Sequence, residues 1–302
     1  MPLATGSAVN GVTGSLALQG KDGVGILRYI PAATISTTIT RGDSVIPLVN
    51  NVAYAVNKIK GSAMADISVD TYLYASLLNA DFFNAAVGAV AGDVGTAGYN
   101  VVTIRSNNQG GEGPQTFARA KFAGMSGSVR FSNNGGAQAF RLGFRMTSVD
   151  PLSVGVVALG APAAGALSLG GELGFAQASF AGATDVVAVS FNLDTGITVI
   201  PGNVAGTNSN FPSLPKGVMQ TVQVGTVTIT QIANPATLLG LSGANGTFVM
   251  SLGAVGAGVS MTFQVMPMSY SKPVETGIGY VSTTYALLSV DGVTAPFVVA
   301  DL

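Results

Sequence analysis

Cysteine, histidine and tryptophan are all absent from this chain of 302 residues, and only 9% of its residues are charged. Without cysteine there is no disulfide framework, no thiolate zinc site and no cysteine nucleophile. Without histidine the chain lacks the usual general base at neutral pH, the Ser/His/Asp constellation and the commonest metal ligand. We therefore expect no enzyme here: no catalytic residue, no cofactor-binding residue and no metal site.

The scarcity of charge also bears on assembly. Thirteen Lys and Arg and 14 Asp and Glu are few beside the ~25% of charged residues that is usual, and the mean hydropathy is +0.49. A surface so poor in charge favours self-association. Residues 1–150 hold 11 basic and 8 acidic residues, and residues 151–302 hold 2 and 6. The halves thus differ in sign, which either favours contacts between opposite halves of different copies or reflects plain divergence.

The chain offers no convincing export or membrane signal. The first 15 residues, MPLATGSAVNGVTGS, lack the basic region and apolar core of a signal peptide. The longest apolar stretch, residues 154–169, is shorter than a membrane-spanning helix and is interrupted by Pro162 and by glycines. We expect no membrane partner, and a linker or β segment over residues 154–184.

Apolar and polar residues alternate with period two along many segments, which is the pattern of half-buried strands. In residues 187–193 the apolar members are Val187, Val189, Phe191 and Leu193, and residues 259–265 repeat the pattern. Val129 and Phe131 precede the turn sequence NNGG (133–136), and alternation resumes over residues 140–146. Two alternating runs around such a cluster predict a hairpin. The sequence therefore predicts a mainly β fold.

Helical patterns are few. The longest covers residues 71–86, with Asp70 as N-cap and an apolar face formed by Leu73, Leu77 and Leu78. A shorter one covers residues 235–239, with Asn234 as cap and proline at the first helical position. We predict one short helix in each half of the chain.

The two halves resemble each other. Residues 115–150 align with residues 256–291 without a gap, and both segments end in SVD. The alignment places Phe122 on Phe263, Met125 on Met266 and Phe144 on Tyr285. Upstream, each half has a strand, a turn and then VIP, at residues 45–47 and 199–201. The shared order of strand, VIP, strand, helix and hairpin predicts a duplication.

Asp194 lies in DTG, the tripeptide that carries the catalytic aspartate of pepsin-like and retroviral proteases. Such an enzyme needs a second carboxylate about 3 Å away. Opposite FNLDTGITVIP (191–201) the first half has TITRGDSVIP (38–47), in which Ser and Val follow Asp43. Because Asp-Gly after a strand is a common turn, we predict a turn at Asp194 and another at the RGD of residues 41–43. An aspartic-type hydrolase and an integrin-binding loop are the remote alternatives.

Other motifs carry little chemistry. The glycine-rich segments 108–115 and 252–260 lack the Lys and Ser/Thr of a phosphate-binding loop. Arg130, Arg141 and Arg145 alternate with apolar residues on the predicted hairpin and would share its polar face. A solvated outer face is the favoured interpretation, and a contact with phosphate or with an acidic surface is the alternative.

Taken together, these features resemble the major tail tube proteins of long-tailed bacteriophages with non-contractile tails. The features are two concatenated β domains, each with one short helix before a terminal hairpin and a long loop, 88–113 in the first half. The second half, from VVAVSFNLDTGITVIPGN through NPATLLG, carries the resemblance most clearly. It implies tandem β-sandwich or barrel-like domains at residues 1–153 and 185–302.

The resemblance further implies a structural virion protein located in the tail and assembled in the host cytoplasm. Copies of the chain would form rings, trimeric and pseudo-hexameric in a duplicated form, that stack into a channel for genome delivery. The tape-measure protein and double-stranded DNA would occupy the lumen without sequence specificity. A capsid decoration or surface adhesion protein is the alternative. The sequence does not indicate which residues face the lumen or the neighbouring copies.

Overall fold

The computed structural model describes residues 14–19, 28–32, 34–46, 57–59, 61–74, 78–80, 82–83, 101–106, 115–131, 138–151, 172–202, 204–205, 213–220, 223–232, 246–271, 279–289, 292 and 295–302. Within these residues the chain is mainly β, as predicted, and all of its strand pairs are antiparallel.

The strands of the first half are β1 (Gly14–Gln19), β2 (Arg28–Ala32), β3 (Thr34–Arg41), β4 (Ser44–Ile46), β5 (Asn57–Ile59), β6 (Ala63–Tyr72), β7 (Val101–Ser106), β8 (Gln115–Arg130) and β9 (Arg141–Pro151). The short 3-10 helix η1 (Phe175–Gln177) separates them from the second half. There the strands are β10 (Ala178–Ala181), β11 (Val186–Asp194), β12 (Ile197–Ile200), β13 (Val204–Ala205), β14 (Ser213–Leu214), β15 (Gly217–Gln220), β16 (Val224–Ile232), β17 (Gly246–Ala254), β18 (Ala257–Ser271), β19 (Tyr280–Leu287) and β20 (Phe297–Asp301).

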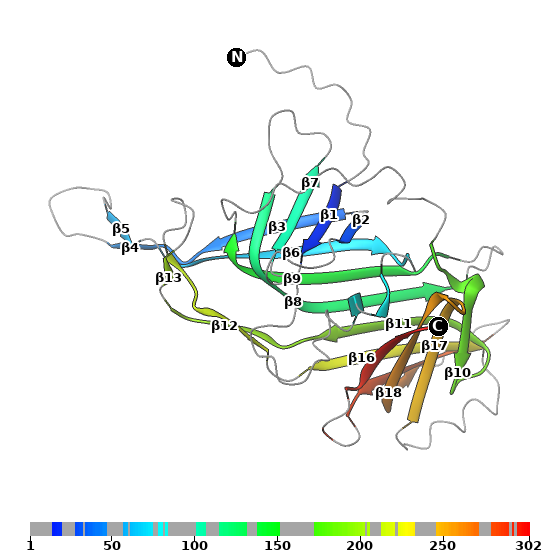
Figure 1. Cartoon of the computed structure of the whole chain (residues 1–302). Helices are drawn as coiled ribbons and strands as arrows, with labels where there is room; N and C mark the ends of the chain where they lie inside the picture. Colours follow the sequence, from blue (N-terminus) through cyan, green and yellow to red (C-terminus); the bar gives the residue numbers. More distant parts are fainter. Residues whose placement is uncertain are drawn as a thin grey trace, which may run out of the picture.

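Eight strands lie side by side in the order β3-β6-β9-β8-β11-β16-β19-β18, and we call them the central sheet (Figure 1). The first four come from the first half of the chain and the last four from the second. Both groups have the same order in the sheet. When the four strands of a group are numbered along the sequence, their spatial order is first, second, fourth, third. The groups join where residues 124–130 of β8 pair with residues 188–194 of β11.

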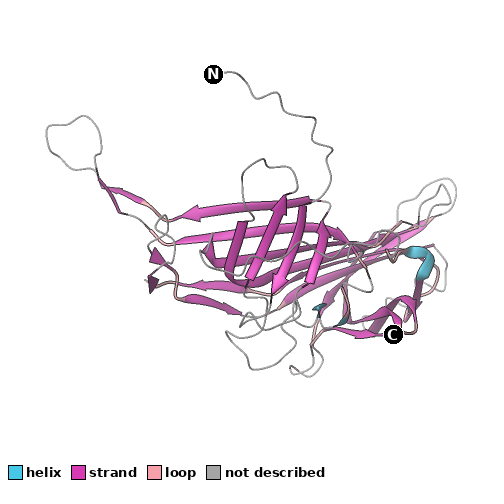
Figure 2. Ribbon diagram, turned by 45° about the horizontal axis from the view of Figure 1, so that its top comes forward, coloured by secondary structure: helices cyan, strands magenta, loops and turns pink. Residues whose placement is uncertain are grey.

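Both β8 and β18 also belong to a second ladder. The beginning of β8 pairs with β7, from which β1 and β2 continue, and the beginning of β18 pairs with β17 and β20. A β-bulge follows in each strand, between Phe122 and Gly124 in β8 and between Pro267 and Ser269 in β18. Bulges bend and twist a strand. The strands of the second ladder consequently run at a steep angle to the long strands of the central sheet and cross over them (Figure 2).

Each half also carries a hairpin arm. The chain leaves β3 into β4, which pairs with β5, and it leaves β11 into β12, which pairs with β15. β4 and β12 contain the valine and isoleucine of the two VIP sequences. Both arms extend from the same end of the central sheet (Figure 1).

One cluster of buried apolar residues runs through both halves. In the first half, the rings of Phe82, Phe122 and Phe144 make edge-on or tilted contacts with centroids 5.5–5.7 Å apart. In the second half, Phe191 of β11 packs against Phe263 and Phe297 at 5.5 and 5.3 Å. Because the core is continuous across the β8–β11 join, the division into domains at residues 153 and 185 stays a prediction.

The predicted helix over residues 71–86 is wrong at its start. Asp70 is no N-cap, because β6 continues to Tyr72. The alternating burial of Ala65, Ile67 and Val69 extends to the buried Thr71, and Leu73 still donates a strand-like hydrogen bond to the carbonyl of Phe140. Residues 80, 82 and 83 are helical. The predicted helix over residues 235–239 lies outside the described residues.

The predicted strands and hairpin are confirmed. Val189, Phe191 and Leu193 are buried in β11, as are the alternating apolar residues of β18 from Val259 to Val265. β8 and β9 form the hairpin, although its turn, residues 133–136, lies outside the described part. Phe131 is 43% exposed and packs on Phe175.

The predicted linker or β segment over residues 154–184 is described from residue 172 onward, and its strand β10 pairs with β17.

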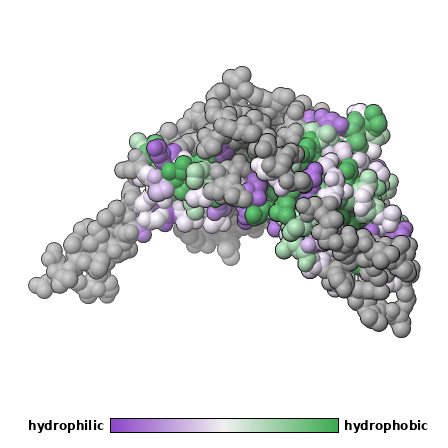
Figure 3. Space-filling view, turned by 90° about the horizontal axis from the view of Figure 1, so that it is seen from below, coloured by the Kyte–Doolittle hydropathy of each residue, from purple (hydrophilic) through white to green (hydrophobic). Residues whose placement is uncertain are grey.

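Among the described residues, no helix has both the length and the apolar character needed to cross a membrane. The described atoms seen from below mix hydrophilic, neutral and apolar residues (Figure 3).

Candidate functional site

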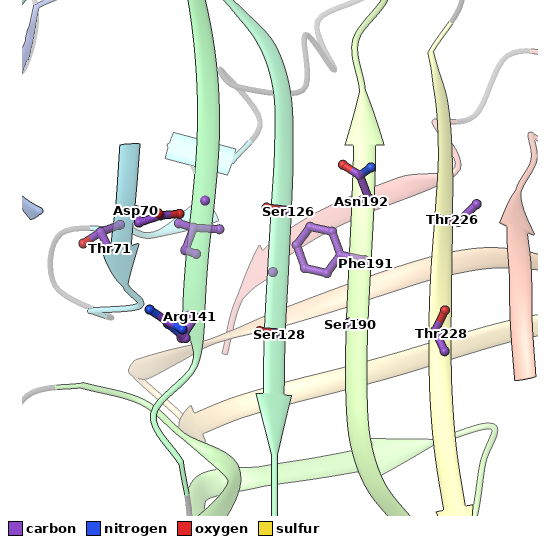
Figure 4. Close-up of a pocket in the computed structure, with 13 residues that line it drawn as sticks. Asp70, Thr71, Ser126, Ser128, Arg141, Ser190, Phe191, Asn192, Thr226 and Thr228 are labelled. Atoms are coloured by element: carbon purple, nitrogen blue, oxygen red, sulfur yellow. The ribbon is translucent and has the colours of Figure 1, made fainter. Parts of the chain in front are cut away.

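One face of the central sheet is covered with small polar side chains. Because side chains alternate across a strand, the residues that lie opposite the core form transverse rows that the strand register defines. One row runs from β6 to β16 through Asp70, Gly143, Ser126, Asn192 and Thr226. The next row runs through Tyr72, Arg141, Ser128, Ser190, Thr228 and Thr284. We call this surface the hydroxyl face (Figure 4).

Hydroxyl groups on the hydroxyl face bind each other across the strands. The oxygens of Thr228 and Thr284 are 3.0 Å apart, and those of Thr230 and Ser282 are 2.9 Å apart. Each hydroxyl both donates and accepts, so such pairs satisfy one another and still accept hydrogen bonds from water. This part of the face is polar without carrying charge.

A shallow hollow of about 420 Å³ lies on the hydroxyl face, across strands β6, β9, β8, β11 and β16 (Figure 4). Gly143 forms part of its floor, and a Cβ there would lie 2.8 Å from the Ser126 hydroxyl and 3.1 Å from a carboxylate oxygen of Asp70. Arg141 lies on the same side of the hollow as Asp70. In the part of the chain that the structure describes, no three or more acidic residues gather to hold a metal ion.

Asp194 lies at the border of this face, and the predicted turn is confirmed. Its Oδ1 accepts a hydrogen bond of 2.8 Å from the N–H of Gly196, which has a φ of 64°. This arrangement is the turn that Asp and Gly favour. The other carboxylate oxygen lies 3.6 Å from Arg145 Nη2, and both side chains are more than half exposed. The aspartate of DTG thus has a turn amide and an arginine as partners.

The ion pair between Arg145 and Asp194 crosses β8. Arg145 of β9 and Asp194 of β11 are both register partners of Gly124 in β8. A Cβ at Gly124 would lie 2.9 Å from Arg145 Nη2. The absence of a side chain at Gly124 therefore lets the arginine reach from the first half of the chain to the second.

The RGD segment connects β3 to β4, and its charged groups contact each other. Arg41 Nε lies 3.3 Å from Asp43 Oδ1, which also accepts a hydrogen bond of 2.9 Å from the N–H of Gly61. Gly42 donates to the carbonyl of Ser62 at 3.1 Å. Asp43 therefore binds a backbone N–H, as Asp194 does, although its donor, Gly61, is distant in sequence and lies just before β6.

The three arginines share one face, as predicted. Arg130, Arg141 and Arg145 are all exposed on the hydroxyl face. Sequence reasoning missed Asp70, which lines the same hollow as Arg141, because Asp70 was assigned to the start of a helix. It also missed the threonines of β16, although their alternation in VGTVTITQI was a readable signal.

No protein-family model and no curated protein matches this chain.

Proposed function

We propose that this chain is a structural virion protein whose copies assemble into stacked rings, the tail tube of a long-tailed bacteriophage. The observation that carries the proposal is the repeated order of four strands within one central sheet. A sheet made of two equivalent groups can be extended by further groups, so each copy adds two units to a ring. Three copies then supply six units, a pseudo-hexamer.

The hydroxyl face is the surface that we assign to the lumen. A channel for DNA must not hold phosphate tightly, and binding to phosphate comes chiefly from Lys and Arg. On this face Arg145 is paired with Asp194 and Arg141 lines the same hollow as Asp70, and the β16–β19 part of the face carries hydroxyl pairs. Such a surface lets double-stranded DNA and the tape-measure protein pass without sequence-specific binding.

The hairpin arms support stacking. Both arms leave the same end of the central sheet, and Val204 and Met219, on strands β13 and β15 after β12, are 39% and 40% exposed. We assign these two residues to contacts between successive rings. The long loop predicted over residues 88–113 is wrong in its middle, because residues 101–106 form β7, which pairs with β1 and β8. The virion tail as location, and assembly in the host cytoplasm, belong to the same proposal.

Negative-stain electron microscopy of the purified protein at increasing concentration tests the proposal. We expect hollow rings or tubes of uniform diameter. Particles that stay monomeric, or trimers that never stack under varied salt and pH, contradict it and favour a capsid decoration or adhesion protein.

A further inference from the structure

The hairpin arm of the second half is too small to hold its shape alone. It consists of strands β12 to β15, in which β12 pairs with β15 and β13 with β14 as two-stranded sheets. We call these four strands the second arm. An isolated two-stranded ribbon is marginally stable in water, yet Ile197, Val199 and Val218 of the second arm are partly buried. Contacts with the rest of the chain must therefore support it.

The base of the second arm lies at a gap along one edge of β8. On that edge residues 115–118 of β8 pair with β7, and residues 124–130 pair with β11. The β-bulge between Phe122 and Gly124 separates these two stretches, and the register of neither neighbouring strand includes Phe122 or Ala123. Because buried backbone groups need hydrogen-bond partners, the carbonyl groups of the bulge require a partner from outside the two ladders.

Thr195 is that partner. Its N–H donates a hydrogen bond of 3.3 Å to the carbonyl of Ala123, and its Oγ1 donates one of 2.6 Å to the carbonyl of Phe122. Thr195 is 1% exposed, so water does not replace the hydroxyl when it is removed. A buried acceptor that loses its donor destabilises a protein more than the loss of an exposed hydrogen bond does. The hydroxyl of Thr195 thus joins the base of the second arm to the first half.

Each residue of the DTG tripeptide has a role at this base. Asp194 pairs with Arg145 of β9 and accepts a hydrogen bond from the N–H of Gly196. Gly196 has a φ of 64°, which turns the chain out of β11 and into the second arm. The ion pair is exposed and contributes little, whereas the contact of Thr195 is buried. The threonine of DTG therefore matters more for the arm than the aspartate does.

A second contact holds the outer part of the second arm. Leu214 of β14 and Ala63, the first residue of β6, form a small cluster of buried apolar residues that is separate from the main core. Ser62, the residue before Ala63, donates a hydrogen bond of 3.4 Å from its Oγ to the carbonyl of Gly202, between β12 and β13. The second arm therefore returns to the first half near the junction of β4 and β6 (Figure 1).

We infer that the second arm is docked on the first half of its own chain, at Thr195 and at Leu214, and so keeps one direction before copies meet. Val204 and Met219, which the proposed function assigns to contacts between rings, are then held in a fixed position. Fixing a contact segment in advance lowers the entropy cost of association. Thr195 is a positioning residue, because it acts through the arm. The inference rests on the proposed function for the use of the arm and not for its docking.

Native-state proteolysis in dilute solution measures the docking. Residues 151–302 contain two basic residues, Lys216 and Lys272, and trypsin does not cut after Lys272 because proline follows it. Lys216 lies between β14 and β15, and its N–H donates a hydrogen bond of 3.1 Å to the carbonyl of Ile200 in β12. Trypsin needs an opened segment around the bond that it cuts, so the rate of cutting at Lys216 follows the population of opened arms. The product, residues 217–302, is identified by its mass.

Thr195→Val removes the hydroxyl and keeps a side chain of similar shape. We expect cutting at Lys216 to become about tenfold faster or more, because the carbonyl of Phe122 loses its buried donor. Thr195→Ser keeps the hydroxyl and should be cut at nearly the rate of the natural chain. An unchanged rate for T195V, or an equal increase for both variants, overturns the inference.

Thr71→Val is the matched control for a general loss of stability. Thr71 is 2% exposed, and its Oγ1 also donates a hydrogen bond to a backbone carbonyl, that of Tyr72 at 3.3 Å. It lies at the opposite end of β6 from Ala63. We expect T71V to be cut at Lys216 at nearly the natural rate. The same acceleration in T71V and T195V contradicts the docking.

Leu214→Ala tests the outer contact. Loss of the buried side chain should also speed cutting at Lys216, because the contact with Ala63 is weakened. Since this substitution lies near the bond that is cut, peptides of residues 210–220 with and without it provide the intrinsic rates. An increase for L214A no larger than that of its peptide contradicts docking at Leu214.

Electron microscopy of T195V separates this inference from the proposed function. We expect its rings to stack into far shorter tubes than those of the natural chain. Tubes of natural length from T195V overturn the positioning role and leave the proposed function standing. A natural chain that forms no rings, while Thr195 protects Lys216 as expected, overturns the proposed function and leaves the docking standing.

Discussion

Gly127 occupies a position where the fold leaves no room for a side chain. It lies in β8 at the internal join, opposite Phe191 of β11. A Cβ there would lie 2.5 Å from Cζ of Phe140 and would overlap the ring of Phe191. The two rings are themselves in contact, with centroids 6.3 Å apart. The glycine thus lets aromatic side chains from two strands pack over β8.

We therefore expect Gly127→Ala to lower the free energy of unfolding by about 1–3 kcal/mol, the usual cost of overpacking. Urea unfolding followed by circular dichroism measures it. Gly246→Ala is the matched control, since the nearest atom to a Cβ at this strand glycine is 3.9 Å away. Equal effects of the two substitutions would contradict the packing argument.

Asp194 gives a second prediction at this scale. Asp194→Asn keeps an oxygen that accepts the Gly196 N–H and loses only an exposed ion pair, which is worth little. Asp194→Ala loses the turn hydrogen bond and should lower the free energy of unfolding by about 1 kcal/mol. Thermal unfolding of the two variants measures the difference. A peptidase activity at acid pH that D194N abolishes would instead revive the hydrolase alternative.

Tyr74 should make the free energy of unfolding decrease at alkaline pH. Burial, and next the neighbouring Glu172 carboxylate, raise the pKa of its phenol above the ordinary value. The folded chain then keeps a proton that the unfolded chain has lost, so this contribution is complete below about pH 10 and is lost as the pH rises further. Urea unfolding at pH 9 and 11 should show a smaller loss for Tyr74→Phe than for the natural chain. An unchanged loss would refute the assignment.

At the scale of elements, the last strand holds a helical turn of the first half. Oδ1 of Asp301 in β20 accepts a hydrogen bond of 2.9 Å from the N–H of Ala80, where the helical residues begin. Side-chain oxygens at such a position cap the free N–H groups of a helix.

Asp301→Ala should therefore cost about 1 kcal/mol of folding free energy, in the range of lost helix caps. Asp301→Asn keeps an acceptor and should cost much less. Chemical denaturation monitored by circular dichroism distinguishes the two. A comparable loss for both variants would indicate that the charge of Asp301, and not its hydrogen bond, is what matters.

Elements were predictable from the sequence where burial alternates, as in β11 and β18. The helix over residues 71–86 was predicted too early, because the leucines after Tyr72 suit a helical face as well as the end of a strand. Strand partners were harder, since alternation indicates which face is buried and not which strand is adjacent. The repeat identified β3 with β11, yet the β8–β11 join depends on residues far apart in the sequence. The alternation of residues predicted that the three arginines share the hydroxyl face, whereas it did not predict that Asp70 lies on that face.

At the scale of the whole molecule, the continuous core predicts that the halves depend on each other. Residues 1–153 and 185–302, produced as separate polypeptides, would expose the β8 and β11 edges and the aromatic residues around Phe191. Each should aggregate or unfold without cooperativity, and co-expression should recover a complex. Gel filtration and thermal unfolding measure this. Two stable monomeric halves would support independent domains instead.

The position of β11 in the chain has a consequence for synthesis. Ribosomes add about 5–20 residues per second, so β8 emerges several seconds before the β11 strand that covers its edge. During that interval the first half offers an open edge to any strand nearby, including β3 of a neighbouring nascent chain. Correct folding therefore requires that β11 of the same chain, which is synthesised later, pairs with β8 before an equivalent strand of another chain does. Slow elongation between residues 131 and 185, or crowding of chains on one messenger, would favour chains linked in the wrong order.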